Sequence, residues 1–406
     1  MKEKGVAIFL AVVLILFLMP LTFTLVYVTR QHQKSSYQEK QIKSARILAD
    51  NAIVDYMRSF SQNYYADHYD TDKLARPQSF YKVGFTEVSV IPDTLNHFIY
   101  IEATGKYGKS ATNPLFRKTL YSVIQFVSPW TDFGTMIDSN FTISASNVTY
   151  YGKFWINGNL YITGWNVRFV GGPIFVSGNL YGSSSVIIDG DLYYGGSSAG
   201  SVTVNGTKYN FMPSLTFPTI DTTYYAEHYN YKITSNSKII FNSNGTFTVV
   251  GSTTIAIPEE GIIIYGQNCS LQIKGTVKGR VTICASGSGS KGKITVYGNL
   301  TYANGTNYAS ESDSIAVLAT NRIIFKKYGS NLTVCGVFQS SSSNYFLMQG
   351  SWGRTFKLYG TRNKGISVSP WYSFSGGRYL YFDPNLSKYP PPGLPEKPYL
   401  VTWHIK

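Results

Sequence analysis

Carboxylates are the residues that could carry chemistry in the C-terminal two thirds of this sequence. Hydrolysis of glycosidic bonds needs two carboxyl groups at a defined separation. Asp189 and Asp191 are spaced i, i+2, which would place both on one face of a strand. Asp191, however, takes the position that asparagine takes in three similar phrases of the chain. That equivalence indicates a role in a turn, and we therefore expect the protein not to be an enzyme.

The phrase that contains Asp191 recurs four times. Its copies are Asn157–Tyr161, Ser177–Tyr181, Asp189–Tyr193 and Tyr297–Thr301, and their central residues are Asn159, Asn179, Asp191 and Asn299. Asn and Asp tolerate tight-turn conformations and accept hydrogen bonds from nearby backbone N–H groups. We predict that the four central residues form one repeated structural corner. The leucines that follow the four corners, Leu160, Leu180, Leu192 and Leu300, would then point inward, in register, as one apolar row.

The segment that holds these phrases, residues 135–388, is predicted to be all β. Ser, Thr, Asn, Gly and Tyr dominate it, and short β-branched runs alternate with glycine. Strands of about five residues with turn residues at this density are typical of a stack of coils or of a sandwich. The recurrent phrase favours a parallel β-helix or solenoid, because a coil repeat places equivalent residues above one another. A β-sandwich is the alternative.

The N-terminus predicts a long helix that begins in a membrane. Val6 to Val28 is a run of 23 residues without a charge, which as a helix spans about 35 Å and is long enough to cross a bilayer. An amphipathic helical pattern continues to residue 62. Its apolar stripe consists of Ile42, Ala45, Ala49, Ala52, Ile53, Tyr56 and Phe60.

The leader Met1–Gly5, with Lys4-Gly5 followed by Val6–Leu10, resembles the N-terminus of type IV pilins and pseudopilins. Most major pilins have glutamate at the fifth mature position, where this chain has Leu10, so the resemblance is closer to PilX-type minor pilins and tip pseudopilins. It implies that a prepilin peptidase cuts between Gly5 and Val6. It also implies single-pass insertion in the cytoplasmic membrane, with the bulk of the chain outside, and a place among other pilin subunits in a surface filament.

The predicted organisation has five parts. A leader covers residues 1–5, the helix residues 6–62, a small pilin-like β module residues 63–130, the β passenger residues 135–388 and a proline-rich C-terminal tail residues 389–406. The β module would contain the strands Phe80–Ile91, His97–Gly105 and Arg117–Phe126. Gly275–Ile283, Ile315–Ala319 and Pro390–Pro395 also resemble segments of an uncharacterised bacterial domain that follows PilX-like N-termini.

Charge and composition limit the partners. The formal net charge is +14, but charged residues make up only 14% of the chain and aromatic residues 16%. Because charged residues are so sparse, we do not expect nucleic acid as a partner. The many tyrosines suit an adhesive surface or the binding of a surface carbohydrate. Aromatic ladders inside the coils would explain the same tyrosines. Cys269, Cys284 and Cys335 fit no metal-ligand spacing, and we expect small buried side chains and no cofactor.

Two other functions stay open at this stage. Basic residues follow the apolar run more densely than they precede it, and the positive-inside tendency would then place the C-terminal bulk in the cytoplasm. A membrane-anchored scaffold similar to the bactofilins would fit that topology. An exported enzyme that acts on polysaccharide is the third candidate, and it would require a groove with paired acids.

Overall fold

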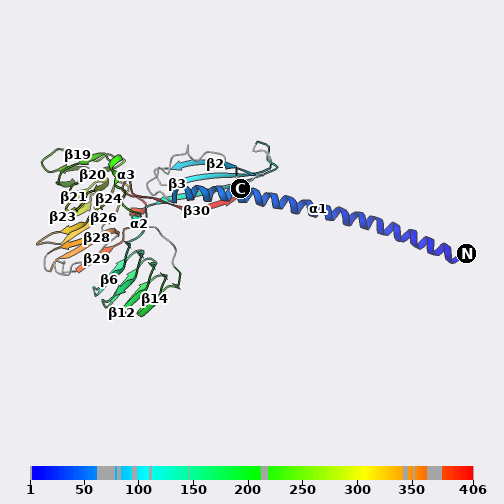
Figure 1. Cartoon of the computed structure of the whole chain (residues 1–406), viewed down its shortest axis with the longest axis horizontal. Coiled ribbons are helices and arrows are strands. Elements are labelled where there is room, and N and C mark those ends of the chain that lie inside the picture. The colour runs from blue at the N-terminus through cyan, green and yellow to red at the C-terminus, as the bar shows by residue number, and fades with distance from the viewer. Residues whose placement is uncertain are drawn as a thin grey trace. The chain divides into compact units, whose positions relative to one another are not determined.

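The computed structural model describes residues 2–61, 78–79, 84–93, 98–108, 112–144, 146–211, 218–341, 346–350, 353–363 and 377–405. The chain forms two compact units. The first consists of Met1–Asn63, Asp67–Phe126 and Pro398–Lys406, and the second of Tyr64–Ala66 and Val127–Lys397. The predicted fold class is confirmed: a long N-terminal helix and a small antiparallel sheet accompany a large sheet of mostly parallel strands (Figure 1).

The first unit combines one helix with five strands. Its elements are α1 (Lys2–Ser61), β1 (Gln78–Ser79), β2 (Gly84–Asp93), β3 (Phe98–Tyr107), β4 (Phe116–Val127) and β30 (Lys397–Ile405). The sheet order is β1-β2-β3-β4-β30, and β1 to β4 pair antiparallel. The three predicted strands are confirmed as β2, β3 and β4. The predicted C-terminal tail is wrong at its end, because a run rich in strand-forming residues, Tyr399–Ile405, belongs to β30.

The second half of α1 packs on the sheet. The buried residues of this segment are Gln41, Ala45, Leu48, Ala49, Ala52, Ile53 and Tyr56. The predicted stripe is therefore confirmed from Ala45 to Tyr56 but not at Ile42, whose side chain is 43% exposed. Gly105 on β3 explains how close the helix comes, since a Cβ there would lie 1.8 Å from the Ala45 carbonyl oxygen. The predicted side-chain position of Phe60 lies outside the described residues.

The first half of α1 continues without a break through Pro20. The Thr24 hydroxyl donates a hydrogen bond to the Pro20 carbonyl one turn earlier (2.7 Å). Among the described residues, no helix is long and apolar enough to cross a membrane. The side chains at positions 1–13 and 15–17, which include most of the predicted span before Leu18 and both residues of the predicted cleavage site, lie outside the described set.

The first half of the second unit is a series of short strands that follow the small helix α2 (Pro129–Asp132). The strands are β5 (Thr135–Ile137), β6 (Phe141–Ile143), β7 (Val148–Tyr151), β8 (Phe154–Ile156), β9 (Leu160–Ile162), β10 (Val167–Val170), β11 (Ile174–Val176), β12 (Leu180–Asp189), β13 (Leu192–Tyr194), β14 (Ser198–Val204) and β15 (Lys208–Tyr209). β5, β8, β11, β13 and β15 pair in that order, all parallel. This is the pairing of a solenoid, in which each coil stacks on the previous one.

The second half continues the same architecture after α3 (Thr222–Glu227). Its strands are β16 (Tyr231–Ile233), β17 (Ser237–Asn242), β18 (Thr246–Val249), β19 (Thr254–Ala256), β20 (Ile262–Gly266), β21 (Leu271–Val277), β22 (Gly279–Ala285), β23 (Ile294–Tyr302), β24 (Asp313–Ala319), β25 (Ile323–Lys326), β26 (Leu332–Ser340), β27 (Phe346–Gln349), β28 (Thr355–Asn363) and β29 (Gly377–Tyr381), followed by the short 3-10 helix η3 (Pro384–Ser387). β17, β18 and β19 form the antiparallel exception at one end.

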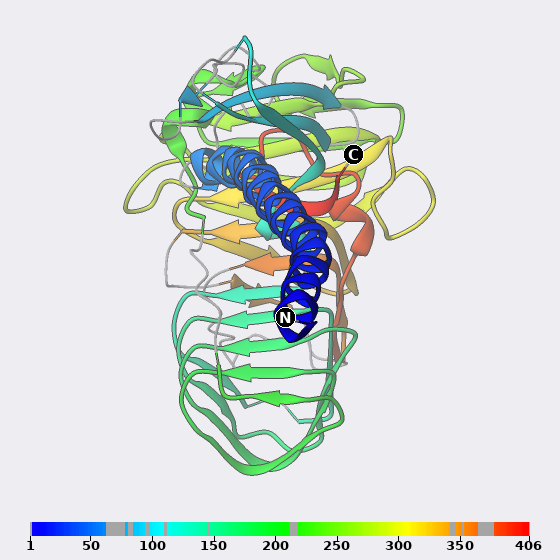
Figure 2. The ribbon, with the colours of Figure 1, turned by 90° about the vertical axis from the view of Figure 1, so that its right-hand side faces the viewer.

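The two halves join into one stack. β28 pairs in parallel with β5, and β29 pairs with β7, so the last coil of the chain lies on the first. Figure 2 shows the strands of the first half as successive rungs, in cyan to green. The chain thus enters in the middle of the stack, runs to one end, restarts at the other end and returns to the middle.

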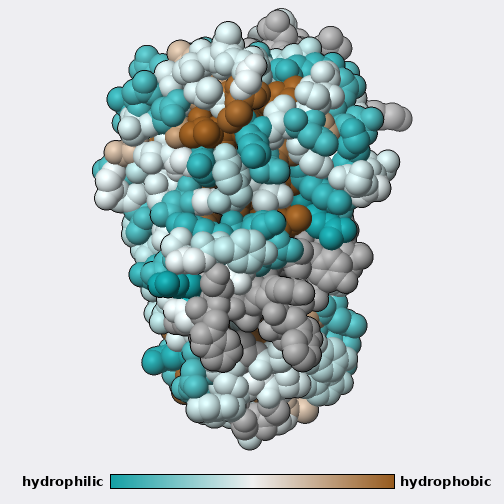
Figure 3. Space-filling view, turned by 90° about the vertical axis from the view of Figure 1, so that its left-hand side faces the viewer, coloured by the Kyte–Doolittle hydropathy of each residue, from teal (hydrophilic) through white to brown (hydrophobic). Residues whose placement is uncertain are grey.

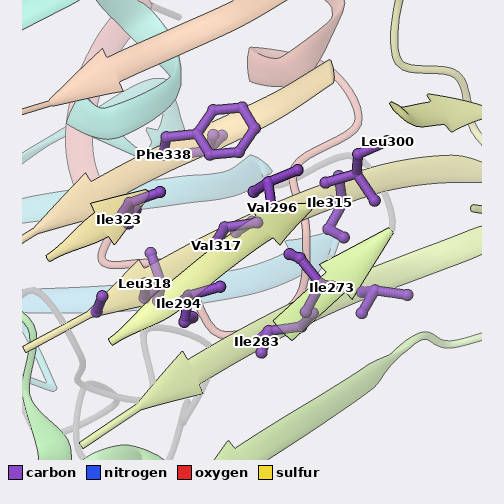
Figure 4. Close-up of a cluster of buried hydrophobic side chains, with 14 of the residues drawn as sticks. Ile273, Ile283, Ile294, Val296, Leu300, Ile315, Val317, Leu318, Ile323 and Phe338 are labelled. Atoms are coloured by element: carbon purple, nitrogen blue, oxygen red, sulfur yellow. The ribbon is translucent and has the colours of Figure 1, made fainter. Parts of the chain in front are cut away.

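Side chains alternate along each strand between the interior of the stack and its outer face, and the inward apolar side chains fill the interior. Ile273, Val296 and Phe325 are fully buried on neighbouring strands, and Figure 4 shows Ile273 and Val296 among other aliphatic side chains of this core. A second buried cluster, from Ile137 to Leu192, lines the first half. Cys269, Cys284 and Cys335 are free and buried, as predicted.

Candidate functional surfaces

The repeated phrases form a ladder of hydrogen bonds between coils. The Asn159 N–H donates to Asn140 Oδ1 (2.8 Å), the Asn179 N–H donates to Asn159 Oδ1 (2.7 Å), and the Ser197 N–H donates to Asn179 Oδ1 (2.7 Å). We call Asn140, Asn159 and Asn179 the asparagine ladder. Each side chain therefore serves the next coil instead of its own turn, and neither Asn159 nor Asn179 has a positive φ. The sequence interpretation missed Asn140, although an Asn followed by an apolar residue 19 positions before Asn159 would have indicated it.

Glycine precedes each recipient of the ladder for a steric reason. A Cβ at Gly158 would lie 2.7 Å from Asn140 Oδ1, one at Gly178 2.3 Å from Asn159 Oδ1, and one at Gly196 2.2 Å from Asn179 Oδ1. These separations are shorter than any van der Waals contact. The two residues of the Gly-Asn pair therefore act together. The glycine leaves room for the side-chain amide of the previous coil, and the asparagine side chain accepts a hydrogen bond from the backbone of the next coil.

The prediction of a single corner is wrong for Asp191 and Asn299. Asp191 precedes β13, where its Oδ1 accepts from the Thr207 N–H (2.8 Å) at a second corner. Asn299 lies within β23, and its Oδ1 accepts from the Thr333 N–H (3.2 Å) and from Lys327 Nζ (2.8 Å). The same kind of bond therefore recurs at different corners, because similar local phrases occur in different rows of the stack.

The predicted apolar row divides in the same way. Leu160, Leu180, Leu192 and Leu300 are all fully buried. Leu180 is in register with Leu160 on β9, whereas Leu192 is in register with Ile174 on β11. The inward direction is confirmed, and the single row is replaced by separate ones.

Asp189 and Asp191 each accept hydrogen bonds from neighbouring coils. Asp189 ends β12 and accepts hydrogen bonds from Arg168 and Asn205 on neighbouring coils. The bond from Arg168 holds the pKa of Asp189 below its ordinary value, whereas a general acid in glycoside hydrolysis needs a raised pKa. Asp191 lies beyond the strand and holds Thr207. Among the described residues, no group of His, Cys, Asp and Glu is arranged to hold a metal ion.

Aromatic side chains stack along the outward positions of the coils. Trp155, Phe175, Tyr193 and Tyr209 occupy one parallel row, with ring centroids 5.1, 4.8 and 4.6 Å apart in that order. Tyr161 and Tyr181 stack in another row at 5.0 Å. The tyrosines of these two rows therefore alternate with inward aliphatic residues, although Trp155 at the start of the first row is buried. Tyr150 stacks on Phe169 inside the coils, with ring centroids 5.3 Å apart, so aromatic residues occupy both positions.

A cationic hollow lies on the outward face of β21, β23, β25 and β27. It has a volume of about 480 Å³. Its lining residues are Gln272, Thr295, Tyr297, Ile324, Lys326, Lys327, Tyr328 and Gln349. We call it the lysine–tyrosine pocket. Figure 3 shows one face of the molecule, which is mostly hydrophilic with a few apolar patches.

The strand register builds this pocket. Gln272, Thr295 and Ile324 are aligned on neighbouring parallel strands, and they alternate with buried residues that anchor each strand in the core. Two positions further along, Lys274 Nζ lies 5.0 Å from the centroid of the Tyr297 ring. Lys326 Nζ lies 5.5 Å from the centroid of the Tyr328 ring.

The pocket has an uncompensated positive charge. No residue in its lining is acidic, and within the described chain none of Lys274, Lys326 and Lys327 lies in an ion pair. Partial burial lowers the pKa of Lys327, while its bond to Asn299 fixes the position of the ammonium group. From Gly261 to Gln349 the sequence has eight Lys and Arg residues and two acids.

A third surface is the first half of α1. Large apolar side chains are exposed along it: Leu14, Leu18, Met19, Leu21, Phe23, Leu25, Val26, Tyr27 and Val28 are each 50–74% exposed. Apolar area of this extent on a single helix needs a covering partner, because a monomeric soluble protein rarely exposes so large a patch.

Comparison with known proteins found little. No family model matches the chain, and no curated protein matches it. Among solved structures, it is similar to the competence-associated pilin ComZ from Thermus thermophilus, with 10% sequence identity, a TM-score of 0.39, and coverage of 90% of this chain and 98% of that one. An identity and a TM-score this low do not establish a shared fold.

Proposed function

We propose that the protein is a non-enzymatic minor pilin- or pseudopilin-like subunit. Its helix is inserted in the cytoplasmic membrane and then in a type IV pilus or secretion filament, and its second unit is displayed outside the cytoplasm. The observation that carries the proposal is the division of α1: its second half is buried against an antiparallel sheet, while large apolar side chains are exposed at Leu14 and from Leu18 to Val28 in the first half. Lipid, and then the helices of neighbouring subunits, would cover that surface.

The chemistry of the second unit supports a role without catalysis. Its most promising acid pair, Asp189 and Asp191, is engaged in contacts between coils. The regular rows of stacked side chains give a stiff display unit, suited to filament assembly or surface attachment.

Processing of the N-terminus tests the proposal. In cells with an active prepilin peptidase, mass spectrometry should find Val6 as the first residue of the mature chain. Gly5→Leu should block the cut, because the peptidase needs a small residue there, and the matched variant Lys4→Ala should still be processed. Recovery of intact Met1 from unaltered protein would leave an uncleaved signal anchor instead.

The orientation in the membrane separates this function from the cytoplasmic scaffold. The scaffold is favoured by one observation, the exposed basic residues Arg30 and Lys34 that follow the apolar run. Protease added to spheroplasts should digest residues 135–406 if the proposal holds. Complete protection until the cells are lysed would assign the chain to the scaffold class.

A further inference from the structure

The lysine–tyrosine pocket has the properties of a ligand site. Its volume of about 480 Å³ is within the range of about 300–1,000 Å³ that is common for small-ligand sites. The strands that form it are held by a fully buried core, so the outward side chains stand on a rigid frame. Cations that lack an acidic partner in a formed hollow indicate a ligand that is itself anionic.

The polar groups between the lysines indicate what kind of anion. Gln272 and Gln349 each carry an amide that both donates and accepts hydrogen bonds, and the Thr295 hydroxyl does the same. A phosphate oxygen only accepts, so phosphate would use the donors of these groups and leave their acceptor oxygens without a partner. A ligand rich in hydroxyl groups uses both kinds of partner.

The aromatic residues of the pocket also favour a ligand made of sugar units. A binding site for single-stranded nucleic acid offers aromatic rings on which bases stack along several nucleotides. Here the Tyr297 and Tyr328 rings already have an ammonium group close by, at 5.0 and 5.5 Å. The rings therefore hold the lysines in position and provide an amphipathic wall, which suits the apolar face of a sugar ring.

We propose that this pocket binds a short segment of an acidic polysaccharide. Carboxylates of the sugar units meet Lys326 and Lys327 of the lining and Lys274, which lies against the lining residue Tyr297. Ring hydroxyls meet Gln272, Thr295 and Gln349. The proposal does not depend on the filament role, because every residue of the pocket belongs to the second unit. The glycan class is defined by its charge and hydroxyl groups, which a neutral glycan and a nucleic acid each match only in part.

Binding of defined oligomers to the full chain in detergent micelles tests the inference. Tetragalacturonate should bind, with a dissociation constant that rises with ionic strength, because partly exposed charges are screened by salt. Lys326→Gln and Lys274→Gln should each weaken this binding about tenfold, the usual result of losing a hydrogen bond to a charged group. Lys208→Gln, an exposed lysine on β15 away from the pocket residues, is the matched control and should leave the dissociation constant unchanged.

Three results would overturn the inference. Maltotetraose, which has the hydroxyl groups but no charge, should bind far more weakly, and equal binding would mean that the lysines are not used. Tighter binding of a single-stranded DNA oligonucleotide that is lost in Lys326→Gln would assign the pocket to a phosphate polymer. The same loss of tetragalacturonate binding in Lys208→Gln as in Lys326→Gln would mean attraction by the net charge alone. Unchanged thermal unfolding of each variant verifies that the fold is intact.

Discussion

The contact between Gly178 and Asn159 gives the sharpest test of the asparagine ladder. In Gly178→Ala the new Cβ would lie 2.3 Å from Asn159 Oδ1 and 3.0 Å from the Gly158 backbone. The amide must rotate away and lose the Asn179 N–H, at a cost of about 0.5–1.5 kcal/mol. Crowding against the Gly158 backbone destabilises the fold by about 1 kcal/mol more. Alanine also lowers the conformational entropy of the unfolded chain, which stabilises the fold by about 0.4–1 kcal/mol. The expected loss in the free energy of unfolding is about 0.5–2 kcal/mol.

A double-mutant cycle separates this mechanism from simple crowding. Asn159→Ala alone should cost about 1 kcal/mol, because the Asn179 N–H loses its acceptor. Once that amide is gone, Gly178→Ala has no hydrogen bond left to break, so its own cost should fall to a few tenths of a kcal/mol. The expected coupling is therefore about 1 kcal/mol, whereas sites that share no partner add within about 0.5 kcal/mol.

Urea unfolding of the full chain in detergent, followed by far-UV circular dichroism, measures the four free energies. The control cycle combines Gly178→Ala with Asp191→Ala, since Asp191 holds Thr207 at another corner, and its two effects should simply add. A Gly178→Ala variant as stable as the unaltered chain, or a coupling equal to that of the control, would refute the steric explanation of the phrase.

Three further predictions concern single positions. Leu192→Ala should lower the free energy of unfolding by about 2–5 kcal/mol, because the side chain is fully buried; a melting temperature equal to that of the unaltered chain would contradict this. Gly105→Ala should loosen α1 from β3, since its Cβ would lie 1.8 Å from the Ala45 carbonyl oxygen; limited proteolysis should then cut the first unit sooner and the second no faster. Burial raises the pKa of Asp383 from 3.8 to about 6 despite bonds from two backbone N–H groups. This group's contribution to stability, about 3 kcal/mol, is complete below about pH 4 and is lost as the pH rises through 6; Asp383→Asn should flatten that slope in urea titrations at pH 4 to 7.

Local patterns in the sequence predicted the elements well. The spacing of Ala45, Ala49 and Tyr56 identified the buried face of the helix, and the strand runs were placed to within a few residues. These features follow from the chemistry of neighbouring residues, because a helical stripe or an alternating strand is encoded within one element. The inward direction of Leu160 and Leu180 was predictable for the same reason.

Relations between distant residues were not predictable in this way. The phrase around Asp191 is similar to that around Asn159, yet the two lie at different corners, because the register of a coil depends on the lengths of all its turns. The lysine–tyrosine pocket also could not be predicted from the sequence. Gln272, Thr295 and Ile324 come together only through the register of three parallel strands.

The order of the coils explains how so large a unit can be inserted within a small sheet. β4 ends at Val127 and β30 begins at Lys397, and these two strands are neighbours in the five-stranded sheet. An ordinary solenoid would begin at one end and finish at the other. Here the second half restarts at the far end and returns until β28 pairs with β5, so the chain enters and leaves the stack at its middle.

The junction that closes the stack is therefore the contact on which this arrangement depends. The Arg362 N–H donates to the Gly134 carbonyl (3.1 Å), and the Asn363 side chain donates to the Trp130 carbonyl (3.0 Å). These bonds join residues that are far apart in the sequence, and loop closure makes such contacts slow to form. Each half can assemble from contacts between successive coils. Pairing of β28 with β5 and of β29 with β7 would then come last, and it would bring the two ends of the inserted unit together.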